Sequence, residues 1–199
     1  EDSMQDDTTP WLRRSLLQSV AGLALVPVVA GTPAAGRSDD ALPIAPPPKG
    51  RAGEFDFLTG EWRIRHRRLK TAGSDDWDVF EGEATCWSIL GGVASIEELR
   101  IPSRQFSGMG LRLFDGDKGH WFELWTNAKG ASLGGPGMPG GFRDGAAVFE
   151  ADDGEGSERM RVRSTWDRIA PNACRWHQAV SRDGGRRWEP HWFMDWLRA

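Results

Sequence analysis

From Glu61 to the end of the chain, apolar and polar residues alternate with a period of two, and this pattern limits the fold more than any other feature. Such alternation is typical of half-buried β-strands, and no segment keeps the 3.6-residue period of an amphipathic helix. Turn residues separate the alternating segments. The pattern predicts nine strands, at residues 61–69, 77–89, 94–101, 106–114, 120–127, 142–150, 158–166, 173–181 and 187–197.

Most of the predicted strands are joined by short links, which indicates an antiparallel up-and-down order. A sheet of this size that stays open leaves two unpaired edges, and unpaired edges promote aggregation. Closing the sheet on itself removes both edges. We therefore expect an all-β fold, a closed antiparallel up-and-down β-barrel of about 8–10 strands.

The alternation also predicts which side chains line the inside of the barrel. Trp62, Ile64 and His66 share one face of the first strand, and arginines occupy the other. The predicted inner face of the last strand comprises Trp188, Pro190, Trp192, Met194 and Trp196. An inner face that is apolar but admits a few polar atoms suits a small barrel that holds one ligand.

The segment "EFDFL" at residues 54–58 is too short for a strand and too apolar for a free tail. We expect it to form a short N-terminal helical plug at one end of the barrel. Gly60 then lets the backbone turn into the first strand. Where the first and last strands meet, Arg198 is expected to stack over Trp62, a cation–π contact of about 0.5–2 kcal/mol.

Residues 1–35 have the order of a secretory signal, with paired arginines, an apolar run and then small residues. Arg13 and Arg14 favour the twin-arginine export route. The apolar run of about 14 residues is shorter than the roughly 20 needed to span a bilayer, so a cleaved signal is preferred to an uncleaved anchor. Residues 36–53 are rich in Pro and Gly and predict a linker. The folded domain is expected at residues 54–199, in a periplasmic or secreted protein.

The charge of the chain argues against a general nucleic-acid partner. The formal net charge is −4, and residues 1–35 hold four acids and two arginines, so removing them takes the charge from −4 to −2. Nucleic-acid binding usually needs a clear basic excess. The basic run at residues 63–70 is therefore interpreted as a solvated strand face rather than a phosphate track.

Gly60-x-Trp62, together with the arginine near the end of the chain, resembles the signature of lipocalins and the wider calycin group. More closely, the chain resembles a bacterial family of uncharacterised lipocalin-like domains in "FDFLTGEW", "SILGGVASIEE", "LRLFD", "HWFELWTNAKG", "RDGGRRWE" and "MDWLR". The resemblance covers almost all of residues 54–199. It implies a β-barrel with an internal cavity and no established reaction. The chain departs from the family in its "GGPGMPGG" insertion and in Arg112, where a smaller polar residue is more usual.

The strand "HWFELWTN" is bulky on both faces, so its alternation does not choose the inward one. If Trp121, Glu123 and Trp125 face inward, desolvation between two indoles raises the pKa of Glu123 and makes it a candidate acid or base. Alternatively, Glu123 forms a structural ion pair with an inward Arg112. Glu97 is also expected inward, and for both glutamates a salt bridge or a surface position is the competing interpretation.

The four histidines lie on different predicted strands, and neither His-x-His nor Cys-x-x-Cys is present, so a zinc site has no support and no cofactor is expected. His66 is interpreted as a hydrogen-bonded core histidine in preference to a ligand contact. Axial haem ligation by His66 rests on analogy with other barrels alone. Cys86 and Cys174 fit either a disulfide in an exported protein or two buried thiols.

The segment Gly130–Gly141 is the longest stretch predicted to lie outside the strands. No helix follows it, so a phosphate cradle is disfavoured. Two alternatives stay open, a mobile lid over the open mouth and a plain hairpin loop.

These features together predict an exported barrel that binds one small hydrophobic or aromatic molecule, without nucleic acid, metal or a membrane span after signal cleavage. The candidate ligand contacts are Trp62, His66, Glu97, Arg112, Glu123, Trp125, Trp176, Gln178 and Trp192. One alternative is a barrel enzyme of the isomerase or lyase type that uses Glu, His and Arg in the cavity, although no catalytic residue is assigned. The other is a non-catalytic structural or interaction domain with a filled interior.

Overall fold

A computed structural model describes residues 42–130, 133, 135–154 and 159–199. The predicted signal at residues 1–35 and the first part of the predicted linker lie outside the described residues. Among the residues that are described, no helix has the length and apolar character needed to cross a membrane.

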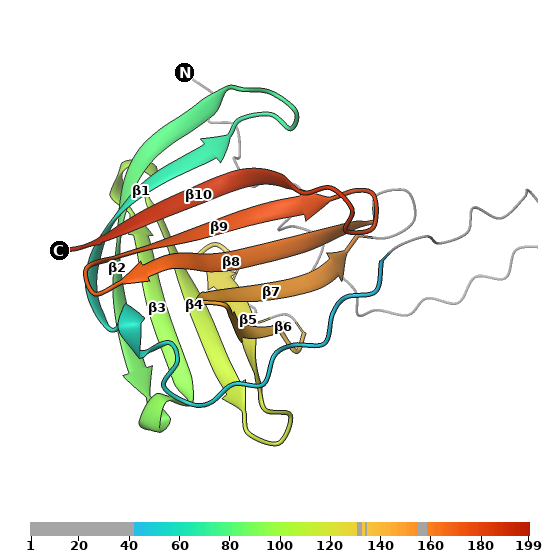
Figure 1. The fold of residues 1–199 in the computed structure, drawn as a ribbon. Coiled ribbons are helices and arrows are strands. Elements are labelled where there is room, and N and C mark those ends of the chain that lie inside the picture. The colour runs from blue at the N-terminus through green and yellow to red at the C-terminus, as the bar shows by residue number, and fades with distance from the viewer. Residues whose placement is uncertain (1–41, 131–132, 134, 155–158) are drawn as a thin grey trace, which may run out of the picture.

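The described residues form a closed antiparallel barrel in which each strand pairs with its neighbours in sequence and the last strand pairs with the first (Figure 1). The ten strands are β1 (Gly60–Leu69), β2 (Trp77–Ile89), β3 (Ala94–Ile101), β4 (Phe106–Asp115), β5 (His120–Asn127), β6 (Met138–Arg143), β7 (Ala146–Asp153), β8 (Met160–Ala170), β9 (Ala173–Ser181) and β10 (Glu189–Arg198). Three short 3-10 helices accompany them, η1 (Asp56–Leu58), η2 (Leu90–Gly92) and η3 (Pro102–Arg104). The predicted all-β, up-and-down barrel is confirmed.

Two strands replace the single strand predicted at residues 142–150. A hairpin turn at Asp144 and Gly145, both with positive φ, separates β6 from β7. β6 also includes the last four residues of the glycine-rich segment, which the sequence placed outside the strands. Gly140 explains the composition of this strand, because a Cβ there would lie 2.2 Å from the carbonyl oxygen of Val148. Position 140 therefore requires glycine, because the backbone of β7 leaves no room for a side chain there.

A β-bulge changes the inner face of β10. The pairing with β9 shifts between Pro190 and Trp192, so that Glu189 lies opposite Val180. Trp188 lies against the guanidinium of the outward Arg163, with Cζ 3.7 Å from the ring centroid. The prediction that Trp188 and Pro190 share the inner face with Trp192 is therefore wrong, because an extra residue in a bulged strand reverses the alternation beyond it.

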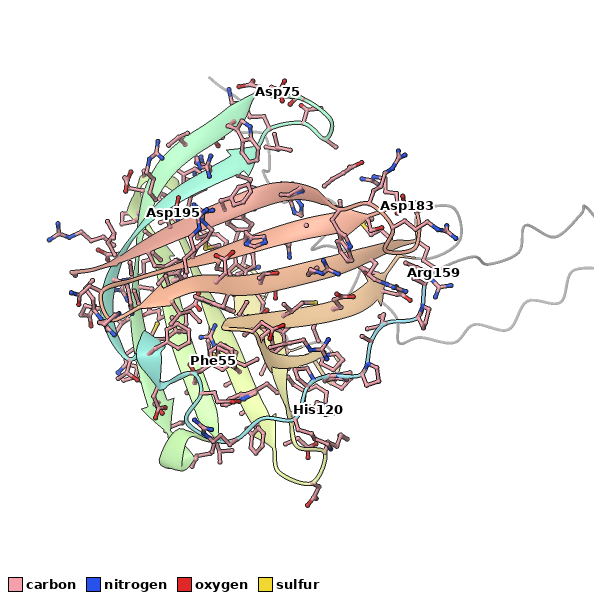
Figure 2. All side chains as sticks on the ribbon, in the orientation of Figure 1. Phe55, Asp75, His120, Arg159, Asp183 and Asp195 are labelled. Carbon is pink, nitrogen blue, oxygen red and sulfur yellow. The ribbon has the colours of Figure 1, made fainter. Side chains whose placement is uncertain are left out.

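η1 lies at one end of the barrel beside the start of β1. Phe55, which is labelled in Figure 2, and Leu58 are buried there, and the indole N–H of Trp62 donates to the Leu58 carbonyl oxygen at 2.6 Å. The guanidinium of Arg198 stacks over Trp62 with Cζ 4.1 Å from the ring centroid, and it donates to the Phe57 carbonyl oxygen at 2.7 Å. The expected contact between Arg198 and Trp62 is present, and this end of the barrel is packed with aromatic side chains.

Residues 42–51 run along the outside of the barrel without forming a helix or strand, and residues 52–54 turn toward η1 (Figure 1). The Leu42 N–H donates to the Gly184 carbonyl oxygen at 2.9 Å, and the Gly50 N–H donates to the Gly119 carbonyl oxygen at 2.9 Å. We call residues 42–54 the strap. It ties the β9–β10 loop to the β4–β5 turn.

Candidate functional site

The inward side chains differ between the two ends of the barrel. Near η1 they are buried, among them Trp62, Trp166 and Trp196. Toward the opposite end, the inward side chains that stay partly exposed include Phe80, Glu123, Trp125, Trp176, Gln178 and Trp192. The barrel is therefore tightly packed at η1, whereas inward side chains are accessible to water toward its other end. We call these six residues the cup.

Aromatic rings form the walls of the cup. Trp176 and Trp192 meet edge to face, with ring centroids 5.7 Å apart. Trp125 packs on Gly108, where a Cβ would come within 2.4 Å of the indole. Large rings fixed against neighbouring strands offer apolar surface at a low cost in conformational entropy. This part of the barrel suits a flat apolar group.

Glu123 lies at the bottom of the cup and is held across the barrel. Its carboxylate accepts a hydrogen bond from the Trp166 indole N–H at 3.0 Å and a short one from the Ser164 hydroxyl. β5 and β8 are not neighbours in the sheet, so these contacts cross the interior. The Glu123 side chain keeps 12% of its exposure. It therefore brings a fixed carboxylate to the base of the hollow.

Arg112 lies beneath Glu123 and is paired mainly with Glu97. The Arg112 Nη1 is 2.9 Å from the Glu97 Oε2 and 4.0 Å from the Glu123 Oε1. Burial raises the pKa of Glu97, and the charge of Arg112 opposes that shift. Burial alone lowers the pKa of Arg112, but the two carboxylates outweigh it and raise it. Arg112 is thus a buried cation between two acids, which leaves the interior with an excess of acid.

His66 belongs to the wall of the barrel rather than to the surface of the cup. Its ring is fully buried and stacks on Phe80, with centroids 4.6 Å apart. The Trp192 indole N–H donates to the His66 Nδ1 at 3.3 Å. A Cβ on Gly82 would lie 2.6 Å from the Nε2 atom, so that side of the ring is closed as well. Burial, with smaller contributions from two arginines, lowers the pKa of His66 to about 3, so the imidazole is neutral at physiological pH.

All nine predicted contact residues lie on the inner face, in four different places. Glu123, Trp125, Trp176, Gln178 and Trp192 belong to the cup, Glu97 and Arg112 lie beneath it, His66 lies behind its wall, and Trp62 lies in the closed end. The inward position of Glu97 agrees with the sequence analysis. For Glu123, the structure has the inward alternative.

Three residues of this region were not among the candidates from the sequence. Phe80 follows the alternation of residues 77–89, so the strand pattern was a usable signal. Ser164 and Trp166 lie on the inner face of β8, but their contacts with Glu123 come from a strand that is not adjacent. Alternation gives the face of a residue and not its partner across a barrel.

Cys86 and Cys174 are free, buried thiols in the structure. Burial raises the pKa of both, that of Cys174 to about 12. Of the two alternatives left by the sequence, the structure has the separate thiols. Within the described part of the chain, no three His, Cys, Asp or Glu side chains are grouped so that they could hold a metal ion.

Comparison with known proteins finds a distant structural similarity. No family model matches the sequence, and no curated protein matches it. Among solved structures, the chain is similar to a protein of unknown function of the DUF3598 family from Nostoc punctiforme, with a TM-score of 0.42 and 13% sequence identity. The similarity covers 76% of this chain and 51% of that protein. The chain thus spans about half the length of the solved protein.

Proposed function

We propose that the barrel binds one small, largely apolar or aromatic molecule in the cup. The observation that carries the proposal is the partial exposure of Trp125, Trp176 and Trp192 on the inner face of the barrel. Contact between water and exposed aromatic surface is unfavourable, and covering that surface with an apolar ligand stabilises the complex by about 25 cal/mol per Å² buried. The resemblance to lipocalin-like domains supports the same function.

The polar groups of the cup add orientation to this binding. Glu123 is a fixed hydrogen-bond acceptor at the base, and Gln178 is held by His191 with 3.0 Å between the Oε1 and Nε2 atoms. Ligand pockets commonly combine an apolar lining with a few such groups. The preferred ligand therefore has a flat apolar body and a donor, such as a hydroxyl or an amine, that reaches Glu123.

Two measurements test this function. Native mass spectrometry of the protein from the organism that makes it should show a small molecule that travels with the chain. Titration with N-phenyl-1-naphthylamine, an uncharged probe that becomes fluorescent in apolar sites, should give saturable binding. Trp176→Leu should weaken that binding about 5- to 30-fold, which corresponds to about 1–2 kcal/mol for a lost aromatic contact.

Trp87→Leu is the matched control, because Trp87 lies on the outer face of β2 and is 45% exposed. It should leave the affinity for the probe unchanged. Equal effects of the two substitutions, or no saturable uptake of any apolar probe, would show that the cup is not a binding site.

We infer further that the protein is exported through the twin-arginine route. The support is the order of paired arginines, apolar run and small residues within residues 1–35, which lie outside the described structure. Replacement of Arg13 and Arg14 by lysine should leave the chain in the cytoplasm of cells that otherwise export it. Unchanged fractionation of that variant would contradict this route.

A further inference from the structure

A cleft of about 340 Å³ lies at the open end of the barrel, between the loop that joins β1 to β2 and the loop that joins β9 to β10. Figure 2 labels Asp75 and Asp183 in these two loops. The residues of the cleft that matter here are Arg68, Lys70, Val180, Arg182, Glu189 and His191. Its size lies within the usual range for small-molecule pockets.

The cleft continues the inner wall of the cup. Arg68 is the next inward position of β1 after His66, and it pairs with Trp192 across the sheet. The Arg68 Cζ lies 4.8 Å from the centroid of the Trp192 ring. Val180 is the next inward position of β9 after Gln178. A ligand that rests on the cup tryptophans therefore ends beside these cleft residues.

The charge of the inner wall changes from the cup to the cleft. Among the ten described residues that line the cleft, Arg68, Lys70 and Arg182 are cations and Glu189 is the single acid. The Lys70 Nζ is 3.1 Å from a carboxylate oxygen of Asp76. Both side chains are more than half exposed, so this ion pair contributes little to stability. The described lining thus carries three cations against one acid, and two of the cations are guanidinium groups.

The neighbouring histidine experiences the same positive field. Burial, together with the charges of Arg68 and Arg182, lowers the pKa of His191 to about 4, so this residue is neutral at physiological pH. Arginine is well suited to carboxylate, phosphate and sulfonate groups, because its guanidinium presents paired donors in one plane. A neutral histidine and two arginines together favour an oxyanion over a cation at the rim.

We propose that the ligand of this barrel is an amphiphilic anion, whose apolar body lies in the cup and whose terminal oxyanion group is held at the rim by Arg68 and Arg182. This assignment rests on the proposed function, because it names the ligand class of the same site. The floor of the cup agrees with it. Arg112 is already paired with two acids there, and Glu123 repels an anionic group, so the charged end of the ligand faces outward.

The test compares two probes that differ in one charged group. 1-Anilinonaphthalene-8-sulfonate carries a sulfonate, and N-phenyl-1-naphthylamine is its uncharged counterpart. The wild-type protein should bind the sulfonate about tenfold more tightly at low ionic strength. Arg68→Gln and Arg182→Gln should each weaken sulfonate binding about three- to fivefold, and the double variant about tenfold. Binding of the uncharged probe should change less than twofold.

Arg63→Gln is the matched control, since it removes the same charge from an exposed position of the same strand. Arg68→Lys should recover part of the affinity that Arg68→Gln loses. Raising the ionic strength should weaken sulfonate binding alone, because exposed charges are screened.

The two proposals fail in different ways. Equal affinity for the two probes, or equal effects of Arg63→Gln and Arg68→Gln on sulfonate binding, would overturn the anionic ligand class while the cup remains a binding site. Absence of saturable binding of both probes would overturn the proposed function and this assignment with it.

Discussion

Replacing Arg112 by methionine should destabilise the protein strongly. The substitution keeps an unbranched, apolar stem but shortens the side chain and removes the guanidinium that faces Glu97 and Glu123. The side chains of Arg112 and Glu97 keep only 1% and 5% of their exposure, so water cannot replace the lost partner. Removal of one member of such a buried pair typically costs about 3–5 kcal/mol. For a domain of this length, the melting temperature should fall by about 10 °C.

The loss should depend on pH in a direction that the structure fixes. Burial raises the pKa of Glu97 above its unfolded value, so the folded chain binds more protons and the free energy of unfolding falls as pH rises through that pKa. Without Arg112 the opposing charge is gone and the pKa rises further. Arg112→Met should therefore lose more stability at pH 7.5 than at pH 5. Guanidinium unfolding followed by tryptophan fluorescence at both pH values measures this difference.

An outward arginine provides the contrast. Arg100 has three carboxylate neighbours, those of Glu83, Glu98 and Glu61 at 2.9, 2.8 and 3.9 Å, but all of them are half-exposed or more. Arg100→Met should cost less than about 1 kcal/mol. Adding Glu97→Gln to Arg112→Met should recover a large part of the loss. An Arg112→Met variant that loses as little as Arg100→Met, with no difference between pH 5 and pH 7.5, would refute the view that this pair is a buried ion pair.

Three further substitutions or reactions have defined outcomes. Gly82→Ala should cost about 1–3 kcal/mol in thermal unfolding, because its Cβ would lie 2.6 Å from a buried imidazole nitrogen, whereas Gly116→Ala meets no atom within 4 Å and should be neutral. Arg198→Lys should lower the free energy of unfolding by about 1–2 kcal/mol, because lysine cannot both stack on the indole and donate to the Phe57 and Thr59 carbonyl oxygens; an unchanged midpoint would contradict that role. Cys86 and Cys174 should react with a disulfide reagent at pH 8 only after denaturant is added, since burial raises both pKa values. Fast labelling of the native protein would show that the interior opens.

Alternation identified the strands and most of the inner face, because successive side chains of a strand point alternately to water and to the interior when only one face of the sheet is buried. Glu97 and Arg112 followed directly from it. β5 was ambiguous for a physical reason. Its outward Phe122 and Leu124 lie beside Leu113 and Leu111 of β4, so the outer face is apolar there as well and the contrast between the faces disappears.

Three other features lie outside what alternation can show. The β10 bulge adds one residue among apolar neighbours. Trp188 therefore keeps the sequence period of the inner face, although its side chain lies on the outer face of the barrel. The division of β6 from β7 needs a turn, and the Asp144–Gly145 pair is a recognised signal for it. The contact of Glu123 with Trp166 depends on barrel curvature, and local sequence carries no record of that distance.

The strap has a consequence for how the chain can be cut. β5 and β6 share three residue pairs, the shortest pairing among the described strands. The strap passes beside them, so that a Cβ on Gly141 would lie 3.3 Å from Pro48. A truncated protein that starts at Glu54 would keep every strand but would lack the strap. The shortest fragment that folds stably should thus start near Leu42. Cleavage before residue 36 would leave the strap intact, whereas proteolysis within the strap would weaken the barrel where β5 pairs with β6.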